Sequence, residues 1–383
     1  MSAASPTPGI EGICTPKFEG VRAALRENFA IDDEIGAAVA VYWRGEAVVD
    51  LWAGHQDAAR KKTWVRDTLV CQMSVAKAVS ALCVHILADR GQVDLDAPIA
   101  RYWPEFAAEG KQDVPIAWAL CHLASVPVAD AAPRGAIFDW DVMTRAIAAQ
   151  KPLWPPGTVP CYHTATQGFI LGEIVRRVTG QGIGAFLRRE VAAPLGLDYH
   201  IGLTPEEEAR CATMIPSAGN VLSAAQAGKA SDLLTRGWAQ LPLNEDFNSH
   251  RWRSGAVPSA SGHGTARSIA RLYAALAAGG TLDGVRLLRP ETMARAWQQQ
   301  WEGKDVMSGL TFRIALGFYL NCPPDRPMGS SPRAFGHSGA GGAQSFGDPD
   351  NQIAFCYTPN RMHSGFDIGP RATRLIEALY RCL

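Results

Sequence analysis

Hydrophobic residues recur with helical spacing in several separate stretches of the chain. Phe18, Val21, Leu25 and Phe29 stand three or four positions apart, which predicts a helix near the N-terminus. The same periodicity predicts further helices over residues 74–90, 164–179, 183–191, 268–278, 290–298 and 370–381. Gly91 follows the 74–90 helix directly, at a position typical of a helix C-terminal cap.

Runs rich in Val and aromatic residues predict strands toward both ends of the chain. Residues 37–43 and 47–53 flank the tight turn Arg44-Gly45-Glu46 and predict a hairpin. Later strands are expected over 312–320, 344–346 and 353–357. Strands from both ends can pair around a helical middle. The pattern therefore favours an α+β fold, an antiparallel sheet flanked by helices with an inserted, mostly helical domain.

We expect two domains. Residues 1–72 and 265–383 would form the α/β sheet domain, and residues 73–264 the mostly helical one, which would carry the nucleophile described below. Within the helical part, residues 219–258 show no clear pattern of either period.

Composition and charge exclude some classes of protein. Lys plus Arg and Asp plus Glu both number 37, so the formal net charge is zero and no basic surface for nucleic acid is expected. Arg60-Lys61-Lys62 is a short basic run of the kind that forms a solvated turn. The apolar run at residues 78–88 contains Ser80 and His85 and is too short to span a bilayer, so no membrane partner is expected.

Cysteine usage bears on the cellular compartment. The nine cysteines are scattered without CxxC pairs, which indicates reduced thiols rather than a disulfide framework. Residues 1–20 lack a basic segment followed by an apolar one and do not predict a secretory signal. Together these features predict a cytoplasmic protein.

The first candidate for chemistry is Ser74-Val75-Ala76-Lys77, at the start of the 74–90 helix. Residues i and i+3 share one helix face, so the serine hydroxyl and the lysine amine can meet. A serine hydroxyl needs a neighbouring base, and a lysine can serve if burial lowers its pKa. The free N–H groups at the helix N-terminus could also hold an oxyanion. The four residues alone fit an ordinary helix start equally well.

Two further motifs follow later in the chain. Tyr162-His163-Thr164 lies in a predicted loop after Trp154-Pro155-Pro156-Gly157, and a phenol close to an ammonium group can relay a proton. The glycine-rich stretch 336–342 includes His337-Ser338-Gly339-Ala340, where a backbone could approach a substrate closely. The N–H of Ala340 could then be an oxyanion donor beside the N–H of Ser74. Taken singly, each motif also fits a structural loop or turn.

In this order and at these spacings, the three motifs resemble those of the serine β-lactamase and penicillin-binding protein superfamily. The chain looks most similar to the class C β-lactamase-like carboxylesterases, called family VIII esterases. The resemblance runs from about residue 37 to the end, and residues 87–98 and 262–266 support it.

The resemblance implies a two-step acyl transfer. Ser74 would attack the carbonyl and form an acyl-enzyme, which water or an alcohol would then release. Lys77 and Tyr162 would move the proton, and Lys77 would keep Tyr162 partly ionised. Which of the two acts as base in each step stays open at this point.

Two positions depart from the β-lactamase pattern. His337 stands where those enzymes carry a lysine, and a neutral imidazole supplies far less positive charge to a substrate carboxylate at pH 7. Thr164 stands where Asn is frequent. The first departure favours uncharged esters over β-lactams, and the second puts in doubt the contacts to amide substrates that the Asn would make. We expect His337, Ser338, Gly339 and Thr164 to contact the substrate.

Several other residues are candidates for the active site. Trp154 and Trp252 are candidates for bordering the acyl pocket. His122 and His263 could be triad bases, but the lysine–tyrosine pair already supplies that function. A G-x-S-x-G nucleophile elbow is absent, and the histidines lack zinc-ligand spacing. No cofactor or metal is expected.

We therefore predict a serine carboxylesterase that cleaves short-chain acyl esters, small-molecule substrates, with weak β-lactam hydrolysis and acyl transfer as side reactions. A peptidase or amidase acting on D-amino-acid substrates, or a β-lactamase, remains an alternative. A catalytically silent binding member of the fold is a third, which the intact Ser74, Lys77 and Tyr162 disfavour. The oligomeric state stays open.

Overall fold

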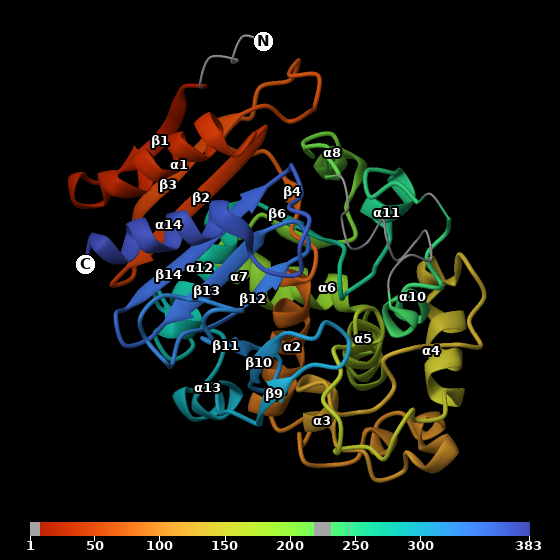
Figure 1. Ribbon diagram of the computed structural model, residues 1–383. Helices are drawn as coiled ribbons and strands as arrows, with labels where there is room; N and C mark the ends of the chain where they lie inside the picture. The colour runs from red at the N-terminus through yellow and green to blue at the C-terminus, as the bar shows by residue number, and fades with distance from the viewer. Residues whose placement is uncertain (1–7, 218–230, 244) are drawn as a thin grey trace.

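A nine-stranded antiparallel sheet forms the centre of the computed structural model, which describes residues 8–217, 231–243 and 245–383 (Figure 1). Its strand order is β1-β3-β2-β14-β13-β12-β11-β10-β9. The strands are β1 (Ile10–Cys14), β2 (Gly36–Trp43), β3 (Glu46–Gly54), β9 (Trp301–Lys304), β10 (Thr311–Ile314), β11 (Tyr319–Leu320), β12 (Phe335–Gly339), β13 (Ala343–Asp348) and β14 (Ile353–Pro359).

Strands from the two ends of the chain meet in the middle of this sheet. β14 pairs antiparallel with β2 along the whole length of β14, with Cys356 opposite Ala40. The α+β prediction, an antiparallel sheet built from both ends around a mostly helical middle, is confirmed.

Helices cover both faces of the sheet. α1 (Glu19–Ile31) and α14 (Gly369–Arg381) pack side by side on one face, and α12 (Ala266–Ala277) covers the other (Figure 1). Side chains alternate along β2, so Val39 and Val41 enter the core under α1 and α14, whereas Ala40 and Tyr42 enter the core under α12. Burial on both faces explains why these strands are apolar almost throughout.

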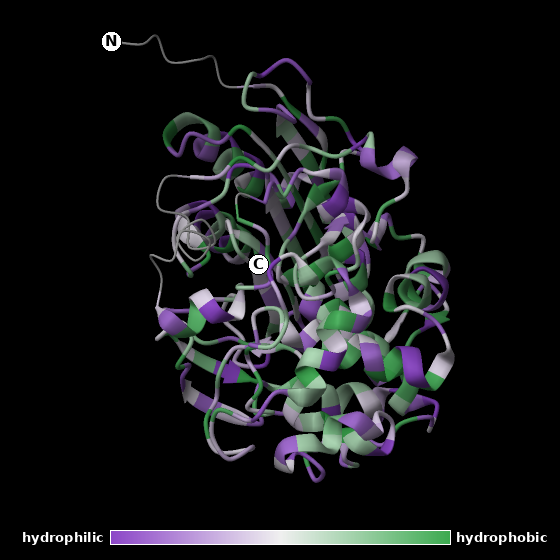
Figure 2. Cartoon of the chain, turned by 90° about the vertical axis from the view of Figure 1, so that its right-hand side faces the viewer, coloured by the Kyte–Doolittle hydropathy of each residue, from purple (hydrophilic) through white to green (hydrophobic). Residues whose placement is uncertain are grey.

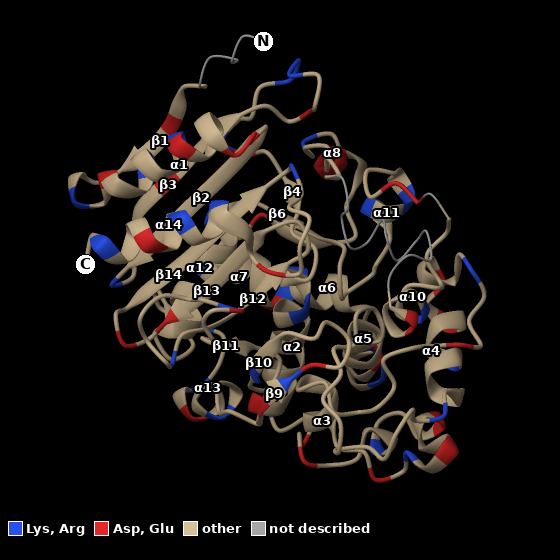
Figure 3. Ribbon diagram, viewed as in Figure 1, with Lys and Arg blue, Asp and Glu red and all other residues tan. Residues whose placement is uncertain are grey.

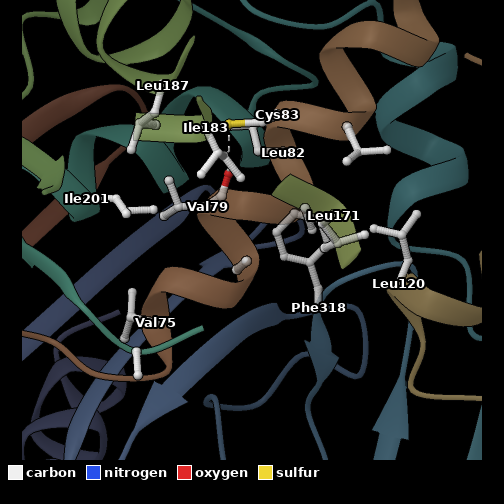
Figure 4. Close-up of a cluster of buried hydrophobic side chains, with 14 of the residues drawn as sticks. Val75, Val79, Leu82, Cys83, Leu120, Leu171, Ile183, Leu187, Ile201 and Phe318 are labelled. Carbon is white, nitrogen blue, oxygen red and sulfur yellow. Dashed lines mark hydrogen bonds between the residues drawn. The ribbon is translucent and has the colours of Figure 1, made fainter. Parts of the chain in front are cut away.

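The helical part of the fold surrounds α2 (Val75–Asp89), whose residues from Val75 to Leu87 are all buried. Figure 4 shows α2 side chains such as Val79 and Leu82 among apolar residues from several other elements. A helix that is apolar on every side belongs inside a core.

The remaining helices and strands are α3 (Ile116–Leu120), α4 (Trp140–Ala149), α5 (Thr166–Thr179), α6 (Ile183–Leu187), α7 (Ala193–Leu195), α8 (Pro205–Glu208), α10 (Asp232–Gly237), α11 (His250–Ser254), α13 (Pro290–Ala296), β4 (Val70–Cys71), β5 (Tyr199–Ile201), β6 (Gly262–Gly264), β7 (Thr281–Leu282) and β8 (Val285–Arg286).

Some elements differ from their prediction. The strand expected over 312–320 is a hairpin of β10 and β11, because the chain turns at Gly317 with a φ of 89°. A Cβ at Gly317 would lie 2.2 Å from the Cβ of Ala81 on α2, so this turn requires glycine. Strand β12 contains the first residues of the glycine-rich stretch 336–342. No strand was expected at the position of β1.

Polarity follows the same layout. Figure 2 shows hydrophobic residues along the sheet strands and mixed polarity along the outer helices. Lys and Arg are interspersed with Asp and Glu over the outer elements (Figure 3). Among the described residues, no helix is both long enough and apolar enough to cross a membrane. Part of the stretch 219–258, which shows no clear hydrophobic period in the sequence, lies outside the described residues.

Candidate active site

Ser74 is the residue that precedes the first turn of α2. It follows Met73, which is buried and has a left-handed φ of 49°. A non-glycine residue in this region is strained, and such strain is concentrated at functional sites. The bend at Met73 leads from β4 into α2 and leaves Ser74 at the wall of a pocket.

Lys77 lies one helical turn after Ser74, and its side chain is only 1% exposed. Its Nζ is 3.3 Å from Ser74 Oγ and donates to the carbonyl oxygens of Thr164 (2.8 Å) and Ser259 (2.9 Å). No acidic side chain pairs with Lys77 in the part of the chain that the structure describes. Burial without a counter-charge lowers the pKa of the Lys77 amine well below its ordinary value.

The carbonyl of Ser259 reaches Lys77 because α5 approaches the 258–261 segment very closely. The N–H of Gly168 on α5 donates to Ser259 Oγ (2.7 Å), and that hydroxyl donates to the Ala165 carbonyl (2.8 Å). A Cβ at Gly168 would lie 2.4 Å from the Ser259 nitrogen, so a larger residue would separate the two segments.

Tyr162 lies in the loop before α5, beside both other residues. The Lys77 amine is 4.7 Å from the centre of its ring. Burial raises the pKa of the Tyr162 phenol above its usual value, and hydrogen bonds with Ser74 and Tyr319 offset part of this rise. The backbone N–H of Tyr162 donates to the buried carboxylate of Asp305 (2.6 Å), which holds this loop in place.

Two backbone N–H groups are available at the pocket wall. Within the described residues, neither the N–H of Ser74 nor that of Ala340 donates a hydrogen bond to the protein. The end of β12 lies directly against the segment that leads into Ser74, since a Cβ at Gly339 would be 2.1 Å from the Gln72 carbonyl oxygen. This close contact brings Ala340 beside the N-terminus of α2.

The pocket in front of Ser74 is mostly apolar and holds about 540 Å³ of empty space, its open mouth included. Its wall is formed by Ser74, Tyr162, Thr164, Leu234, Trp238, Ser308, Phe312, Tyr319, Arg326, Ser338, Gly339, Ala340, Gly365 and Phe366. The structure therefore brings seven of the expected site residues together: Ser74, Lys77, Tyr162, Thr164, Ser338, Gly339 and Ala340.

Three expected substrate contacts need correction, because their side chains lie outside the pocket wall. His337 is 2% exposed, and its ring packs against Tyr319 with centroids 4.3 Å apart. Trp252 is completely buried between Phe138 and Phe247. The indole N–H of Trp154 donates a hydrogen bond to the Val159 carbonyl oxygen in the same loop (3.2 Å).

The two histidines considered as triad bases are also placed by the fold. His122 lies beside Tyr162 but its Nδ1 accepts the backbone N–H of His163 (3.1 Å), and burial lowers its pKa well below the ordinary value. His263 lies on β6 and bonds the Ser261 carbonyl (2.9 Å). No three His, Cys, Asp or Glu side chains of the described chain cluster closely enough to bind a metal ion.

Several residues of the site have no motif in the sequence. Ser259 contributes a main-chain carbonyl, which any residue type could supply. Tyr319, Arg326, Phe312 and Trp238 line the pocket as isolated side chains from different elements. A run of local sequence could not have identified them.

Comparison with known proteins identifies the family of this chain. A model of the Beta-lactamase family matches residues 21–380. The esterase/beta-lactamase LipL of Mycobacterium tuberculosis is 30% identical over 374 residues, covering 93% of this chain and 86% of LipL. Esterase EstB of Burkholderia gladioli is 28% identical and covers 93% of this chain and 92% of its own. The crystal structure of a family VIII carboxylesterase is 40% identical, with a TM-score of 0.90 over 98% of this chain and all of that one.

The chain belongs to the Beta-lactamase family. The resemblance inferred from its three motifs is therefore confirmed, and so is the β-lactamase/transpeptidase-like fold.

Proposed function

We propose that this chain is a serine carboxylesterase that cleaves short-chain acyl esters through an acyl-enzyme on Ser74. The observation that carries the proposal is the position of the buried Lys77 amine, 3.3 Å from Ser74 Oγ and without a counter-charge among the described residues. Membership of the Beta-lactamase family and the names of the esterase relatives support the same reaction class.

The hydrogen bonds of Lys77 favour this residue as the base. A neutral amine has two N–H groups and one lone pair, and the Thr164 and Ser259 carbonyls take the two N–H groups. The lone pair then faces the hydroxyl of Ser74, which donates its proton to it. Lys111 offers a contrast, because three carbonyl oxygens surround its Nζ at 2.7–3.0 Å and no hydroxyl contacts it.

Tyr162 complements Lys77 as the acid. Its raised pKa keeps the phenol protonated at neutral pH, and its hydrogen bond with Ser74 places it beside the reacting oxygen. We therefore revise the expectation of a partly ionised Tyr162. When Ser74 Oγ bonds to the ester carbonyl, the C–O bond to the alcohol breaks and the alcohol oxygen takes a proton from Tyr162. The Tyr162 phenolate then takes the proton that Lys77 received from Ser74, which restores both the phenol and the neutral amine.

The N–H groups of Ser74 and Ala340 would stabilise the negative carbonyl oxygen of each tetrahedral intermediate. Water then attacks the acyl-enzyme, with Lys77 taking its proton, and the proton passes to Ser74 Oγ as the bond between this oxygen and the acyl carbon breaks. An alcohol in place of water gives acyl transfer. Because the apolar side chains Leu234, Trp238 and Phe366 limit the pocket, short acyl groups fit it best.

The test is hydrolysis of p-nitrophenyl acetate and butyrate by the wild-type chain and by Ser74→Ala. We expect the variant to lose at least about a thousandfold in kcat, because the covalent route is removed. A fluorophosphonate probe should label the wild type at Ser74, as read by peptide mass spectrometry, and should leave Ser74→Ala unlabelled. Retained turnover by Ser74→Ala would exclude Ser74 as the nucleophile.

Rates on three substrates separate the alternatives. We expect p-nitrophenyl esters to be cleaved faster than nitrocefin, and nitrocefin faster than a D-alanyl amide. Preference for nitrocefin would indicate a β-lactamase, and preference for the amide a D-amino-acid peptidase or amidase. The absence of turnover and of labelling would indicate a silent member of the fold.

Two further expectations belong to this proposal. We expect a division into a sheet domain, 1–72 and 265–383, and a helical domain, 73–264. All nine strands of the large sheet lie within the two segments of the first domain, which supports this division. A cytoplasmic location is supported by nine cysteines that are all free. Cell fractionation with an antibody against the chain would test the location.

A further inference from the structure

Arg326 is a buried cation in the wall of the candidate active site. It lies in the connection between β11 and β12, where its backbone N–H donates to the Cys322 carbonyl (2.7 Å) and closes a turn. Its side chain lines the pocket with Ser74 and Tyr162, and the residue is only 4% exposed. Within the described wall of this pocket, Arg326 is the one charged residue.

The guanidinium of Arg326 has no polar partner in the part of the chain that the structure describes. Its Nε and Nη1 are buried and make no hydrogen bond. Its contacts are with aromatic faces, 5.1 Å from the centre of the Phe312 ring and 5.6 Å from that of Tyr319. A buried charge without a partner is unfavourable, so it persists where function requires it.

Nearby carboxylates are engaged elsewhere. Asp305 accepts the N–H of Tyr162 and two hydrogen bonds from Ser308, and Asp325 accepts the N–H of Thr311. Neither of them pairs with Arg326.

The other arginine that is buried in the described part of the chain has polar partners. Arg371 is 6% exposed and donates to the Glu34 carboxylate (2.6 Å) and to the Arg361 carbonyl (2.6 Å). The unpaired state of Arg326 is therefore a specific feature of the pocket, and its free N–H groups point to a partner that arrives with the ligand. A carboxylate matches the geometry of a guanidinium best, since two parallel hydrogen bonds can form.

The aromatic contacts of Arg326 show which half of an ester would meet it. Phe312 and Tyr319 both pack against Tyr162, with ring centroids 6.5 and 6.3 Å apart. Arg326 thus lies on the Tyr162 side of Ser74. Tyr162 gives its proton to the departing alcohol, so the alcohol half of the ester occupies this side of the pocket.

We propose that Arg326 binds a carboxylate on the alcohol half of the substrate, so that the enzyme prefers esters of hydroxy acids over neutral esters. This inference rests on the proposed esterase function. It also revises the preference for uncharged esters expected from His337. The positive charge that a lysine would bring at that position is supplied instead by Arg326, on the neighbouring side of Tyr319.

The test compares 4-acetoxybenzoate with methyl 4-acetoxybenzoate, which differ in the charge on the leaving group. Hydrolysis of each consumes one water and releases acetate with 4-hydroxybenzoate or its methyl ester. The variants are Arg326→Met, Arg326→Lys and, as a matched control, Arg333→Met, whose exposed arginine lies on the same connection and pairs with Asp350. The readout is the ratio of kcat/KM for the acid to kcat/KM for the methyl ester, which cancels the intrinsic reactivity of each compound when variants are compared.

We expect Arg326→Met to lower this ratio about ten- to hundredfold, the scale of one charge-assisted hydrogen-bonded pair. A fall of both rates by the same factor would leave this ratio unchanged, so a general loss of activity does not count as support. Arg326→Lys should retain part of the preference, and Arg333→Met all of it. An unchanged ratio in Arg326→Met would overturn the inference.

A measurement on the wild type alone covers the case in which Arg326→Met does not fold. The product 4-hydroxybenzoate should inhibit hydrolysis of p-nitrophenyl acetate at least tenfold more strongly than 4-hydroxybenzamide does, and added salt should weaken that inhibition. Equal inhibition by the two compounds would overturn the inference. If the wild type cleaves no ester, the proposed function fails. If it cleaves both esters with a ratio independent of Arg326, the anion site alone fails.

Discussion

At the scale of single residues, the two buried lysines Lys77 and Lys111 differ in one contact, and this contact is what favours Lys77 as the base. Both amines are buried and bonded to main-chain carbonyls, but one contact of Lys77 is the hydroxyl of Ser74. Burial lowers the pKa of Lys111 to about 8, and burial also lowers the pKa of Lys77 well below its ordinary value. This lowering favours the neutral amine, which is the form that can accept a proton.

This state of Lys77 predicts the pH profile of the enzyme. We expect kcat/KM for p-nitrophenyl acetate to fall at low pH, where the amine becomes protonated, and to stay level into the alkaline range, where Tyr162 keeps its proton. The acidic limb should shift strongly with temperature, as ionisation of an amine does and ionisation of a carboxyl group does not.

Tyr162→Phe is the control for this assignment. It should lower the rate about a hundredfold and leave the acidic limb in place, because the amine is unchanged. A limb that disappears in Tyr162→Phe, or one whose midpoint lies at the usual value of a lysine, would contradict Lys77 as the base.

At the scale of elements, periodicity located the helices well and the strands less well. The helix expected over 164–179 begins at Thr166, which leaves Tyr162 in the loop where it was expected. The apolar run 312–320 predicts one strand where the structure has two, because a buried hairpin has no polar turn to mark it. The close contact between β12 and the start of α2 depends on a glycine, and the pattern of hydrophobic residues in the sequence does not reveal it.

The contact between β12 and the Gln72 carbonyl leads to a prediction for Gly339→Ala. The added Cβ would lie 2.1 Å from that oxygen, so β12 must move and take the Ala340 N–H with it. We expect kcat for p-nitrophenyl acetate to fall about a hundredfold, the effect of losing one oxyanion donor. Rates should be normalised to the fraction of chains that a fluorophosphonate labels.

The matched control is Gly182→Ala at the start of α6. A Cβ there meets nothing within 4 Å, and its φ of −63° suits alanine, so activity should not change. A Gly339→Ala variant as active as Gly182→Ala would show that the position of Ala340 does not matter.

At the scale of the whole molecule, the site exists because distant segments meet around α2. Ser74, Thr164, Ser259 and Ala340 come from four separate regions of the chain. The sheet that supports them closes only when β14 reaches β2. A buried group joins these ends, since Glu34, between α1 and β2, accepts hydrogen bonds from Arg371 on α14 and from Tyr357 on β14.

Glu34→Gln should therefore destabilise the protein by about 3 kcal/mol, because it leaves the Arg371 charge buried without a carboxylate. Urea unfolding followed by tryptophan fluorescence measures this change. Glu377→Gln removes an exposed ion pair with Arg381 on the same helix and should change stability by less than about 0.5 kcal/mol. Equal midpoints for the two variants would show that the buried group does not hold the termini together.

The sequence by itself identified the candidates for the chemistry and the local elements that hold them. Ser74 and Lys77 meet because they stand three residues apart on a helix, and burial patterns recur with the period of each element. Only the tertiary structure decided which groups complete the site. The Ser259 carbonyl, the unpaired Arg326 guanidinium and the burial of His337 depend on contacts between segments far apart in the chain, and no local pattern records such contacts.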